Sequence, residues 1–402
     1  MARQYKAVNL GQGAPDWETP QFVKDAAKTA IDANLNQYAM AQGSMRLRTA
    51  LAAKYTPLLD RTVDPETDIV VTNGTSQALQ ICMTGLLAPG DEAIIMEPAF
   101  DLYGPQVRLA GAQPRYIPLR WQPTEATANA AGRQTSRAWT LDLDELRGLC
   151  NERTKVFLLN TPQNPTGKVF SRDELTAIAD VIRSAAPNCI VVADEVYEHM
   201  VFDGTRHERM ATIPGMGERT LTLSSAGKTF SCTGWKIGWV IGPKEIVASV
   251  AVPHIYGPFC VSAPFQDAVG AALEAAEKEY EGKPSFYAHL LEMYTGKRDV
   301  LMRALTDAGL DPIEPEGTFF IMANIGNVDA IEPEFLNAED KPARDYAFCR
   351  WLTQKVGVAA IPPTAFYIPE HRHVGENFAR FAFCKTDEAL VEASKRLATL
   401  QK

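Results

Sequence analysis

The feature that most limits the fold is an alternation of short apolar runs with helical patterns between roughly residues 40 and 285. The apolar runs, of a kind typical of buried β-strands, cover residues 68–72, 92–96, 155–159, 189–193, 220–223 and 237–241. The helical patterns cover residues 76–87, 103–112 and 171–185. The last of these opens with Ser171 and Glu174, whose spacing predicts a capping box that satisfies two free amides. Such an alternation predicts an α/β domain built on a mostly parallel sheet.

A change of pattern divides the chain into three predicted parts. Residues 1–40, with several glycines and prolines, are expected to form an N-terminal arm and small-domain segment, and residues 41–285 the large domain. Residues 286–402 are expected to form a smaller α+β domain. Its predicted elements are helices over 285–305, 344–356 and 387–400 and strands over 319–323, 358–361 and 378–383. Within the large domain, residues 122–138 lack apolar periodicity and predict a surface loop.

Charge and hydropathy argue against two classes of protein. The 402 residues include 40 Lys and Arg against 49 Asp and Glu, a net charge of −9 without a basic block, which argues against a nucleic-acid-binding surface. No apolar run approaches the roughly 18 residues that a membrane-spanning helix needs. The seven cysteines include no C-x-x-C pair and predict reduced core residues. We therefore expect a cytoplasmic protein, or a mitochondrial one if a presequence has been removed.

Lys228 is the strongest candidate for a reactive group. It lies in a turn of small residues, Ser224-Ser225-Ala226-Gly227-Lys228-Thr229, between two predicted strands. A lysine that acts as an amine nucleophile has to be partly desolvated and held on such a tight turn. A solvated surface lysine is the alternative interpretation. A phosphate-loop NTPase is disfavoured, because the pattern G-x-x-x-x-G-K-[ST] requires glycine at the position of Thr222.

Three further polar groups follow predicted strands, and the carboxyl ends of parallel strands are where ligands bind. Asp194 ends one strand, an asparagine- and proline-rich segment over 160–167 follows another, and Asn73-Gly74-Thr75-Ser76 joins a third to a helix. Each alone has a structural explanation as a cap or a turn. Together with Lys228 they offer a carboxylate, an amide donor, a phosphate cradle and an amine. Pyridoxal phosphate needs all four groups.

With these residues assembled, the sequence resembles the fold type I pyridoxal-phosphate enzymes. Within them it is similar to class I/II aminotransferases of the kynurenine aminotransferase branch, which includes glutamine transaminase K and cysteine-conjugate β-lyase. The segments that carry the resemblance are VNLGQGAPD at 8–16, NTPQNPTGKVF at 160–170, DEVY at 194–197, SAGKTFSCTGWK at 225–236 and NFARFAF at 377–383. The resemblance implies an aspartate-aminotransferase-like α/β fold, with a mostly parallel seven-stranded sheet in the large domain and a smaller α+β domain.

The resemblance also implies roles for the residues around the cofactor ring. Lys228 would bond covalently to the cofactor aldehyde and, once released, move a proton between the substrate Cα and the cofactor. Asp194 would hold the pyridinium nitrogen. Asn164 and Tyr197 would donate hydrogen bonds to the phenolic oxygen, and Phe100 would stack on the ring.

A second set of implied residues would hold the phosphate and the substrate. The phosphate would be bound by Gly74, Thr75, Ser76, Ser225 and Lys236. Tyr38 would reach the phosphate of the partner subunit, which implies a homodimer. Arg380 would bind the substrate carboxylate in a bidentate pair, with Asn164 beside it and with Gly13 and Gln12 lining the same pocket.

The sequence departs from the family pattern where the amino-acid side chain is expected to bind. Where the kynurenine branch usually has an aromatic–histidine pair before Pro264, this chain has Val261-Ser262-Ala263. Those positions normally shape the pocket from the partner subunit, so the specificity stays open. Trp17 is a candidate for an aromatic cover over the substrate, with a core anchor as the alternative.

These observations predict a homodimeric aminotransferase that uses pyridoxal phosphate and no metal. The amino donor would be a neutral or aromatic L-amino acid such as kynurenine, glutamine or methionine, and the acceptor a 2-oxo acid. A β-lyase acting on cysteine S-conjugates at the same site is one alternative, since the same cofactor chemistry can expel a group from Cβ. A pyridoxal-phosphate-binding protein without catalytic activity is another.

Overall fold

The computed structural model describes residues 1–340 and 342–401, and its centre is a seven-stranded sheet in the order β2-β10-β9-β8-β7-β3-β4. The strands are β2 Ile69–Asn73, β3 Glu92–Glu97, β4 Gln113–Pro118, β7 Thr154–Asn160, β8 Ile190–Asp194, β9 Thr220–Ser225 and β10 Ile237–Ile241. β10 is antiparallel to both its neighbours, and the other pairs are parallel. The predicted α/β fold with a mostly parallel sheet is therefore confirmed.

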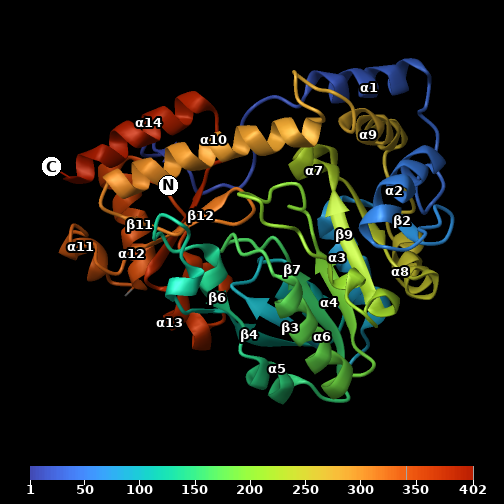
Figure 1. Cartoon of the computed structure of the whole chain (residues 1–402), viewed down its shortest axis with the longest axis horizontal. Coiled ribbons are helices and arrows are strands. Elements are labelled where there is room, and N and C mark those ends of the chain that lie inside the picture. The colour runs from blue at the N-terminus through green and yellow to red at the C-terminus, as the bar shows by residue number, and fades with distance from the viewer. Residues whose placement is uncertain (341, 402) are drawn as a thin grey trace.

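The sheet is buried on both faces because neighbouring residues of a strand point to opposite sides. In β7, Phe157 packs in one hydrophobic cluster and Leu158 in another; Ile94 and Ile95 of β3 divide in the same way. The helices that flank the sheet include α3 Gly74–Leu86, α4 Tyr103–Leu109, α5 Leu143–Leu149, α6 Arg172–Ala185 and α8 Lys244–Tyr256 (Figure 1). The predicted capping box of α6 is present: Ser171 and Glu174 each accept a hydrogen bond from the other's backbone N–H.

β4 was not predicted, because its sequence QPRYIP shows no apolar run. It is an edge strand of the sheet, a position that tolerates Pro114. The surface loop predicted over 122–138 is wrong at its end. There Ser136 and Ala138 are fully buried in a 3₁₀ turn, next to the short hairpin of β5 Arg120–Trp121 and β6 Trp139–Thr140.

The C-terminal part contains a second, three-stranded antiparallel sheet of β11 Asp311–Pro312, β12 Phe320–Asn324 and β14 Phe378–Ala382. Its helices include α10 Phe286–Asp307, α11 Pro333–Leu336, α12 Arg344–Trp351, α13 Arg372–Gly375 and α14 Asp387–Leu397. The helix predicted over 344–356 changes to a π-helix at Leu352–Val356. The strand predicted over 358–361 is shorter, β13 Val358–Ala359. This smaller unit of helices and strands matches the predicted α+β domain.

The N-terminal residues contact both parts of the molecule. β1 Val8–Asn9 pairs with β13, while α1 Gln21–Asp32 lies beside α9 Ala263–Ala276, with α2 Met45–Leu58 on the other side of α9 (Figure 1). One hydrophobic cluster runs through Leu10, Tyr197 and Phe320, so the packing is continuous across the predicted bounds at 40 and 285. The division into 1–40, 41–285 and 286–402 stays a prediction.

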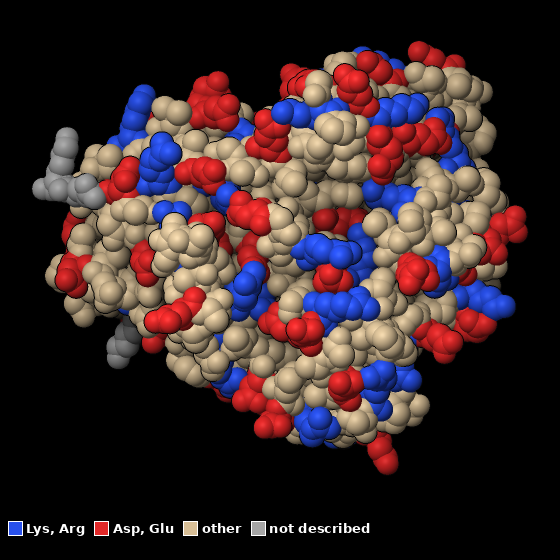
Figure 2. Space-filling model, in the orientation of Figure 1, with Lys and Arg blue, Asp and Glu red and all other residues tan. Residues whose placement is uncertain are grey.

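The surface carries both signs of charge. Figure 2 shows Lys and Arg interspersed with Asp and Glu over the face drawn. Among the described residues, no helix combines the length and apolar character that crossing a bilayer requires. In the same part of the chain, no group of three or more His, Cys, Asp and Glu is arranged to hold a metal ion.

Candidate active site

A cavity of about 810 Å³ lies at the carboxyl ends of β7, β8 and β9, where parallel strands present their ligand-binding edge. It brings together nearly all the predicted site residues: Gly13, Gly74, Thr75, Ser76, Phe100, Asn164, Asp194, Tyr197, Ser225, Lys228, Lys236 and Arg380. Tyr38 lies elsewhere, with 84% of its surface exposed and its ring against Phe259. The cavity therefore unites side chains from the arm, the central sheet and the C-terminal part.

Lys228 lies on α7 Ala226–Thr229, the single helical turn that follows β9. Its Nζ donates a hydrogen bond to the Gly13 carbonyl oxygen at 2.8 Å. Burial lowers the pKa of Lys228, and the nearby Arg380 and Lys236 cations lower it further. A larger fraction of this amine is thus neutral at physiological pH than for a surface lysine, as nucleophilic attack requires.

Asp194 is the last residue of β8 and is buried. Its Oδ2 accepts a hydrogen bond from the Tyr103 hydroxyl at 2.8 Å, and its Oδ1 accepts one from the Val196 N–H at 3.3 Å. Burial raises the pKa of Asp194 to about 6. Burial thus destabilises the charged carboxylate, and a cationic partner inside the cavity would stabilise it. Tyr103 was missed in the sequence, although it follows the predicted Phe100 by three residues.

The N-terminus of α3 forms an anion cradle at one end of the cavity. Gly74 has φ of +71°, and a Cβ at this position would lie 3.1 Å from the Lys236 Nζ. That Nζ lies 3.5 Å from the Ser76 Oγ. Within the described residues, the buried Thr75 hydroxyl has no hydrogen-bond partner. Free amides, hydroxyls and an ammonium group around one space suit a phosphate dianion.

Arg380 occupies the other end of the cavity, on β14. Its Nη1 donates to the Asn164 Oδ1 at 3.0 Å and its Nη2 to the Gly11 carbonyl oxygen at 2.5 Å. The guanidinium carbon lies 4.2 Å from the ring centre of Phe320 and 5.2 Å from that of Phe366. Burial lowers the pKa of Arg380 to about 10, so the group stays charged at neutral pH. Because Asn164 accepts through its oxygen, its amide N–H groups remain as donors.

A family model identifies the class of protein to which this chain belongs. The model of the family "Aminotransferase class I and II" matches residues 5–397. The chain is a class I and II aminotransferase. The predicted family and the predicted transaminase activity are both confirmed.

Relatives and solved structures agree with this assignment. The aminotransferase is 43% identical to a kynurenine–oxoglutarate transaminase of Dictyostelium discoideum, over all of this chain and 92% of the relative. It superposes on Bna3p, a putative kynurenine aminotransferase of Saccharomyces cerevisiae, with a TM-score of 0.89 at 33% identity, covering 100% of this chain and 94% of that one. It also superposes on N-succinyldiaminopimelate aminotransferase of Mycobacterium tuberculosis with a TM-score of 0.85 at 40% identity, covering 99% and 94%.

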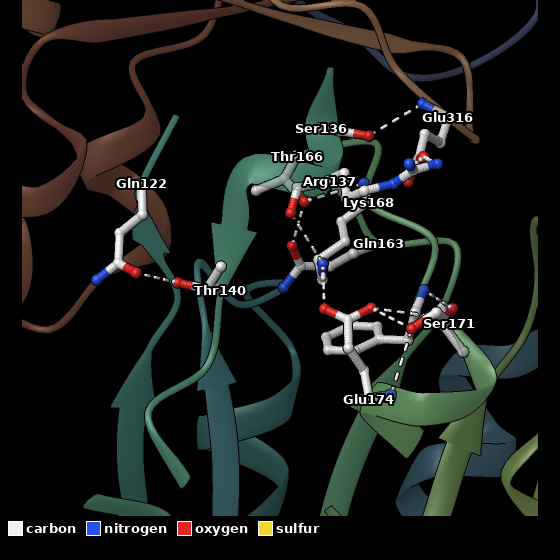
Figure 3. A network of polar contacts seen from close by, with 12 residues as sticks. Gln122, Ser136, Arg137, Thr140, Gln163, Thr166, Lys168, Ser171, Glu174 and Glu316 are labelled. Atoms are coloured by element: carbon white, nitrogen blue, oxygen red, sulfur yellow. Dashed lines mark hydrogen bonds and ion pairs between the residues drawn. The ribbon is translucent and has the colours of Figure 1, made fainter. Parts of the chain in front are cut away.

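In the aminotransferase, the loop that presents Asn164 is fixed by a polar network behind it (Figure 3). The fully buried Lys168 places its ammonium 2.7 Å from a Glu174 oxygen and 3.3 Å from the Arg137 carbonyl oxygen. Ser136 donates to the Gly167 carbonyl oxygen at 2.9 Å. These contacts join the loop to α6 and to the turn at residues 136–138. No local pattern indicated these contacts, because Lys168 and Gly167 lie 31 residues from their partners Arg137 and Ser136 in the chain.

Three residues considered for the substrate pocket of the aminotransferase, Trp17, Val261 and Ser262, are not part of the cavity lining. Trp17 donates its Nε1–H to the Ser231 Oγ at 2.9 Å and packs on Tyr294, which favours its interpretation as a core anchor over that of a substrate cover. Val261 is buried and Ser262 precedes α9. The cavity instead contains residues that the sequence did not indicate: Asp101, Phe320, Ile361, Ala365 and Phe366.

Proposed function

We propose that this aminotransferase uses pyridoxal phosphate to move the amino group of a neutral or aromatic L-amino acid, of the kynurenine, glutamine or methionine type, to a 2-oxo acid. One observation carries the proposal. A half-buried amine (Lys228), a buried carboxylate (Asp194), an anion cradle at α3 and a buried guanidinium (Arg380) line a single cavity. Each is a group that this chemistry requires.

The residues present fit the cofactor. The phosphate would lie at Gly74–Ser76, Ser225 and Lys236, where the orphaned Thr75 hydroxyl supplies a donor. Phe100 would stack on the ring and Asp194 would hold its nitrogen, while Asn164 and Tyr197 would donate hydrogen bonds to its phenolic oxygen. When bound, pyridoxal phosphate supplies an aldehyde that links to amino groups and a protonated ring that withdraws electrons from the substrate Cα.

The chain's own residues then divide the work of the reaction. Arg380 binds the α-carboxylate, which orients the substrate Cα toward Lys228. Lys228, whose pKa is lowered mainly by burial, would take the proton from the substrate Cα as a base and deliver it to the former aldehyde carbon of the cofactor as an acid. Asp194, held in place by the Tyr103 hydroxyl, would as an anion favour a protonated ring nitrogen.

The lining of the cavity supports a neutral or aromatic side chain. Phe100, Phe320, Ile361 and Phe366 give it an apolar surface, and the cations of the described lining are Lys228, Lys236 and Arg380, which the proposal already uses. The relatives bearing kynurenine–oxoglutarate transaminase names favour kynurenine as donor and oxoglutarate as acceptor. The mycobacterial relative puts N-succinyldiaminopimelate on the list of donors to be tested.

We further propose a homodimer in the cytoplasm. Large apolar side chains are exposed in and near the loop that carries Tyr38: Met40 at 58%, Phe259 at 47% and Tyr256 at 86%. Exposed apolar residues near one another are typical of an interface. In this assembly Tyr38 would reach the phosphate of the partner subunit, and Val261 and Ser262 would border the partner's substrate pocket. Sedimentation of the purified protein tests the dimer, which a monomer at micromolar concentration would contradict.

An absorption titration tests the proposed chemistry. The protein reconstituted with pyridoxal phosphate should show the visible band of the bound cofactor. The band should bleach with L-kynurenine, L-glutamine or L-methionine and return with 2-oxoglutarate. If a cysteine S-conjugate instead gives pyruvate without net bleaching, β-lyase activity predominates. A band that ignores every amino acid indicates a non-catalytic binder, and absence of a band contradicts the cofactor.

A further inference from the structure

The segment over residues 361–371 forms one wall of the cavity through Ile361, Ala365 and Phe366. Phe366 is the residue that matters most, because its ring lies 5.2 Å from the guanidinium of Arg380. Such a contact restricts where a guanidinium can point and shields it from water. The position of this segment thus affects how Arg380 meets a carboxylate.

The first half of the segment is attached to its own part of the chain. Ile361 and Arg380 exchange two backbone hydrogen bonds, at 3.0 and 3.1 Å. The Thr364 N–H donates to the Oδ2 of the buried Asp345 at 2.7 Å. These bonds fix the start of the wall, but Phe366 lies beyond them.

The second half is attached to the central sheet through Glu97, the last residue of β3. Glu97 is buried, and both its oxygens face this segment: Oε1 accepts from the Ile368 N–H at 2.6 Å and Oε2 pairs with His371 Nδ1 at 2.5 Å. Close by, the Ala99 N–H donates to the Phe366 carbonyl oxygen at 2.8 Å. Figure 1 shows α13, which starts just after His371, beside the sheet. Loss of either partner would leave a buried carboxylate oxygen without its hydrogen bond, which destabilises this arrangement of the segment.

Glu97 and His371 lie 274 residues apart in the chain, and neither lines the cavity. Glu97 is also joined to the cavity along the chain, since Phe100 follows it by three residues. The pair therefore lies between the wall that carries Phe366 and the strand end that carries Phe100. It is placed to set the distance between these two aromatic residues of the cavity.

We propose that Glu97 and His371 are positioning residues for substrate recognition. They hold the wall so that Phe366 lies against Arg380 and the guanidinium is aimed at the α-carboxylate, a role of Arg380 that rests on the proposed function. Amino acid and 2-oxo acid both carry that carboxylate. Loss of the pair should therefore release Phe366 and weaken both substrates. Phe100 is held separately, because its ring packs against Tyr103 at 5.8 Å and Tyr103 is hydrogen-bonded to Asp194, so the cofactor end should stay unchanged.

The test compares His371→Ala with His371→Asn, whose amide nitrogen can replace the imidazole Nδ1 as donor. We expect His371→Ala to raise KM for amino donor and oxo acid alike by about tenfold, the loss of one charge-assisted hydrogen bond. Its kcat and cofactor affinity should stay within about twofold of wild type, and His371→Asn should restore most of KM. His373→Ala changes an exposed histidine two positions further along the chain; it is the matched control and should change neither constant. Glu97→Gln, which keeps an acceptor for Ile368, should behave like a milder His371→Ala.

Two results would overturn the proposal. One is a wild-type KM in His371→Ala and Glu97→Gln. The other is a fall in kcat and cofactor affinity with KM unchanged, which would indicate general structural damage. An amine that lacks the α-carboxylate gives a further check, since in single-turnover bleaching it should not distinguish His371→Ala from wild type.

Arg380→Lys separates failure of this inference from failure of the proposed function. If Arg380→Lys weakens carboxylate binding and His371→Ala does not, only the positioning role fails. If Arg380→Lys has no effect, the assignment of Arg380 itself is refuted.

Discussion

The two ends of the cavity are built in different ways. The cofactor end comes from residues at or just after strand ends of a single sheet: Gly74, Asp194, Ser225 and Lys228. The substrate end is assembled from the arm, β14 and the wall at 361–371, which meet only in the folded chain. Sheet geometry thus fixes the chemistry, while long-range contacts shape the specificity. A family built this way can change substrates without changing its reaction.

The largest effect should come from removing the amine at the cofactor end. Lys228→Ala should lower kcat by about 10⁴-fold, because the other lysine of the described cavity lining, Lys236, lies at the anion cradle beside Ser76. The cradle at α3 is untouched, so pyridoxal phosphate should still bind, without the visible band of the lysine-linked cofactor. Stopped-flow absorption and equilibrium dialysis measure the two quantities. Retained transamination would contradict the role of Lys228.

The next effect should be confined to the substrate end. Arg380→Lys keeps the charge but loses the planar fork that pairs with a carboxylate and stacks between rings. We expect KM for donor and acceptor to rise by about 100-fold, with cofactor affinity unchanged. Steady-state kinetics and a cofactor titration check this. A selective loss for oxoglutarate alone would mean that Arg380 binds the distal carboxylate.

The converse variant sharpens the contrast. Lys236→Ala removes the ammonium 3.5 Å from Ser76 Oγ and should weaken pyridoxal phosphate binding by about tenfold. KM of the saturated enzyme should hardly change, because Lys236 lies at the cofactor end. Dialysis against limiting cofactor measures the affinity. A raised KM with normal cofactor affinity would place Lys236 among the substrate-binding residues.

A pH titration tests whether the charge of Asp194 contributes to binding at the cofactor end. Burial raises the pKa of Asp194 to about 6 in the chain without cofactor, so the carboxylate is anionic above that pH and becomes neutral as pH falls through it. Cofactor affinity of wild type should therefore exceed that of Asp194→Asn several-fold at pH 8. The difference should narrow toward pH 5, as measured by fluorescence titration. A difference that does not depend on pH would contradict the assignment.

The smallest effect is expected outside the cavity. Trp17→Phe loses the hydrogen bond to Ser231 and should reduce the free energy of unfolding by about 1 kcal/mol. Thermal denaturation measures this loss, and KM for every donor should stay at the wild-type value. A raised KM without a change in stability would restore Trp17 as a substrate cover.

This contrast also explains what could be predicted. Motif residues that follow strands, such as Asp194 and Lys228, could be placed together because parallel strands bring their carboxyl ends to one edge. Glu97 carries no local signal, because its partners Ile368 and His371 lie 271 and 274 residues further along the chain. Phe366 carries none either, because only the fold brings Arg380 and the Ala99 N–H to it. The edge strand β4 was missed for a different reason. Its first four residues are exposed or half-buried, so the strand forms without an apolar run. Tyr103 shows an intermediate case, close to a predicted residue but visible as a partner of Asp194 only in the fold.

The most direct test of the account follows the nitrogen itself. Purified protein loaded with pyridoxal phosphate would be given L-kynurenine labelled with heavy nitrogen at its α-amino group, together with 2-oxoglutarate, and the products analysed by mass spectrometry. The account predicts that the label appears in glutamate. Release of the label as ammonia would contradict the account. So would label that stays in kynurenine, if the same enzyme also transfers nitrogen from no other neutral or aromatic donor.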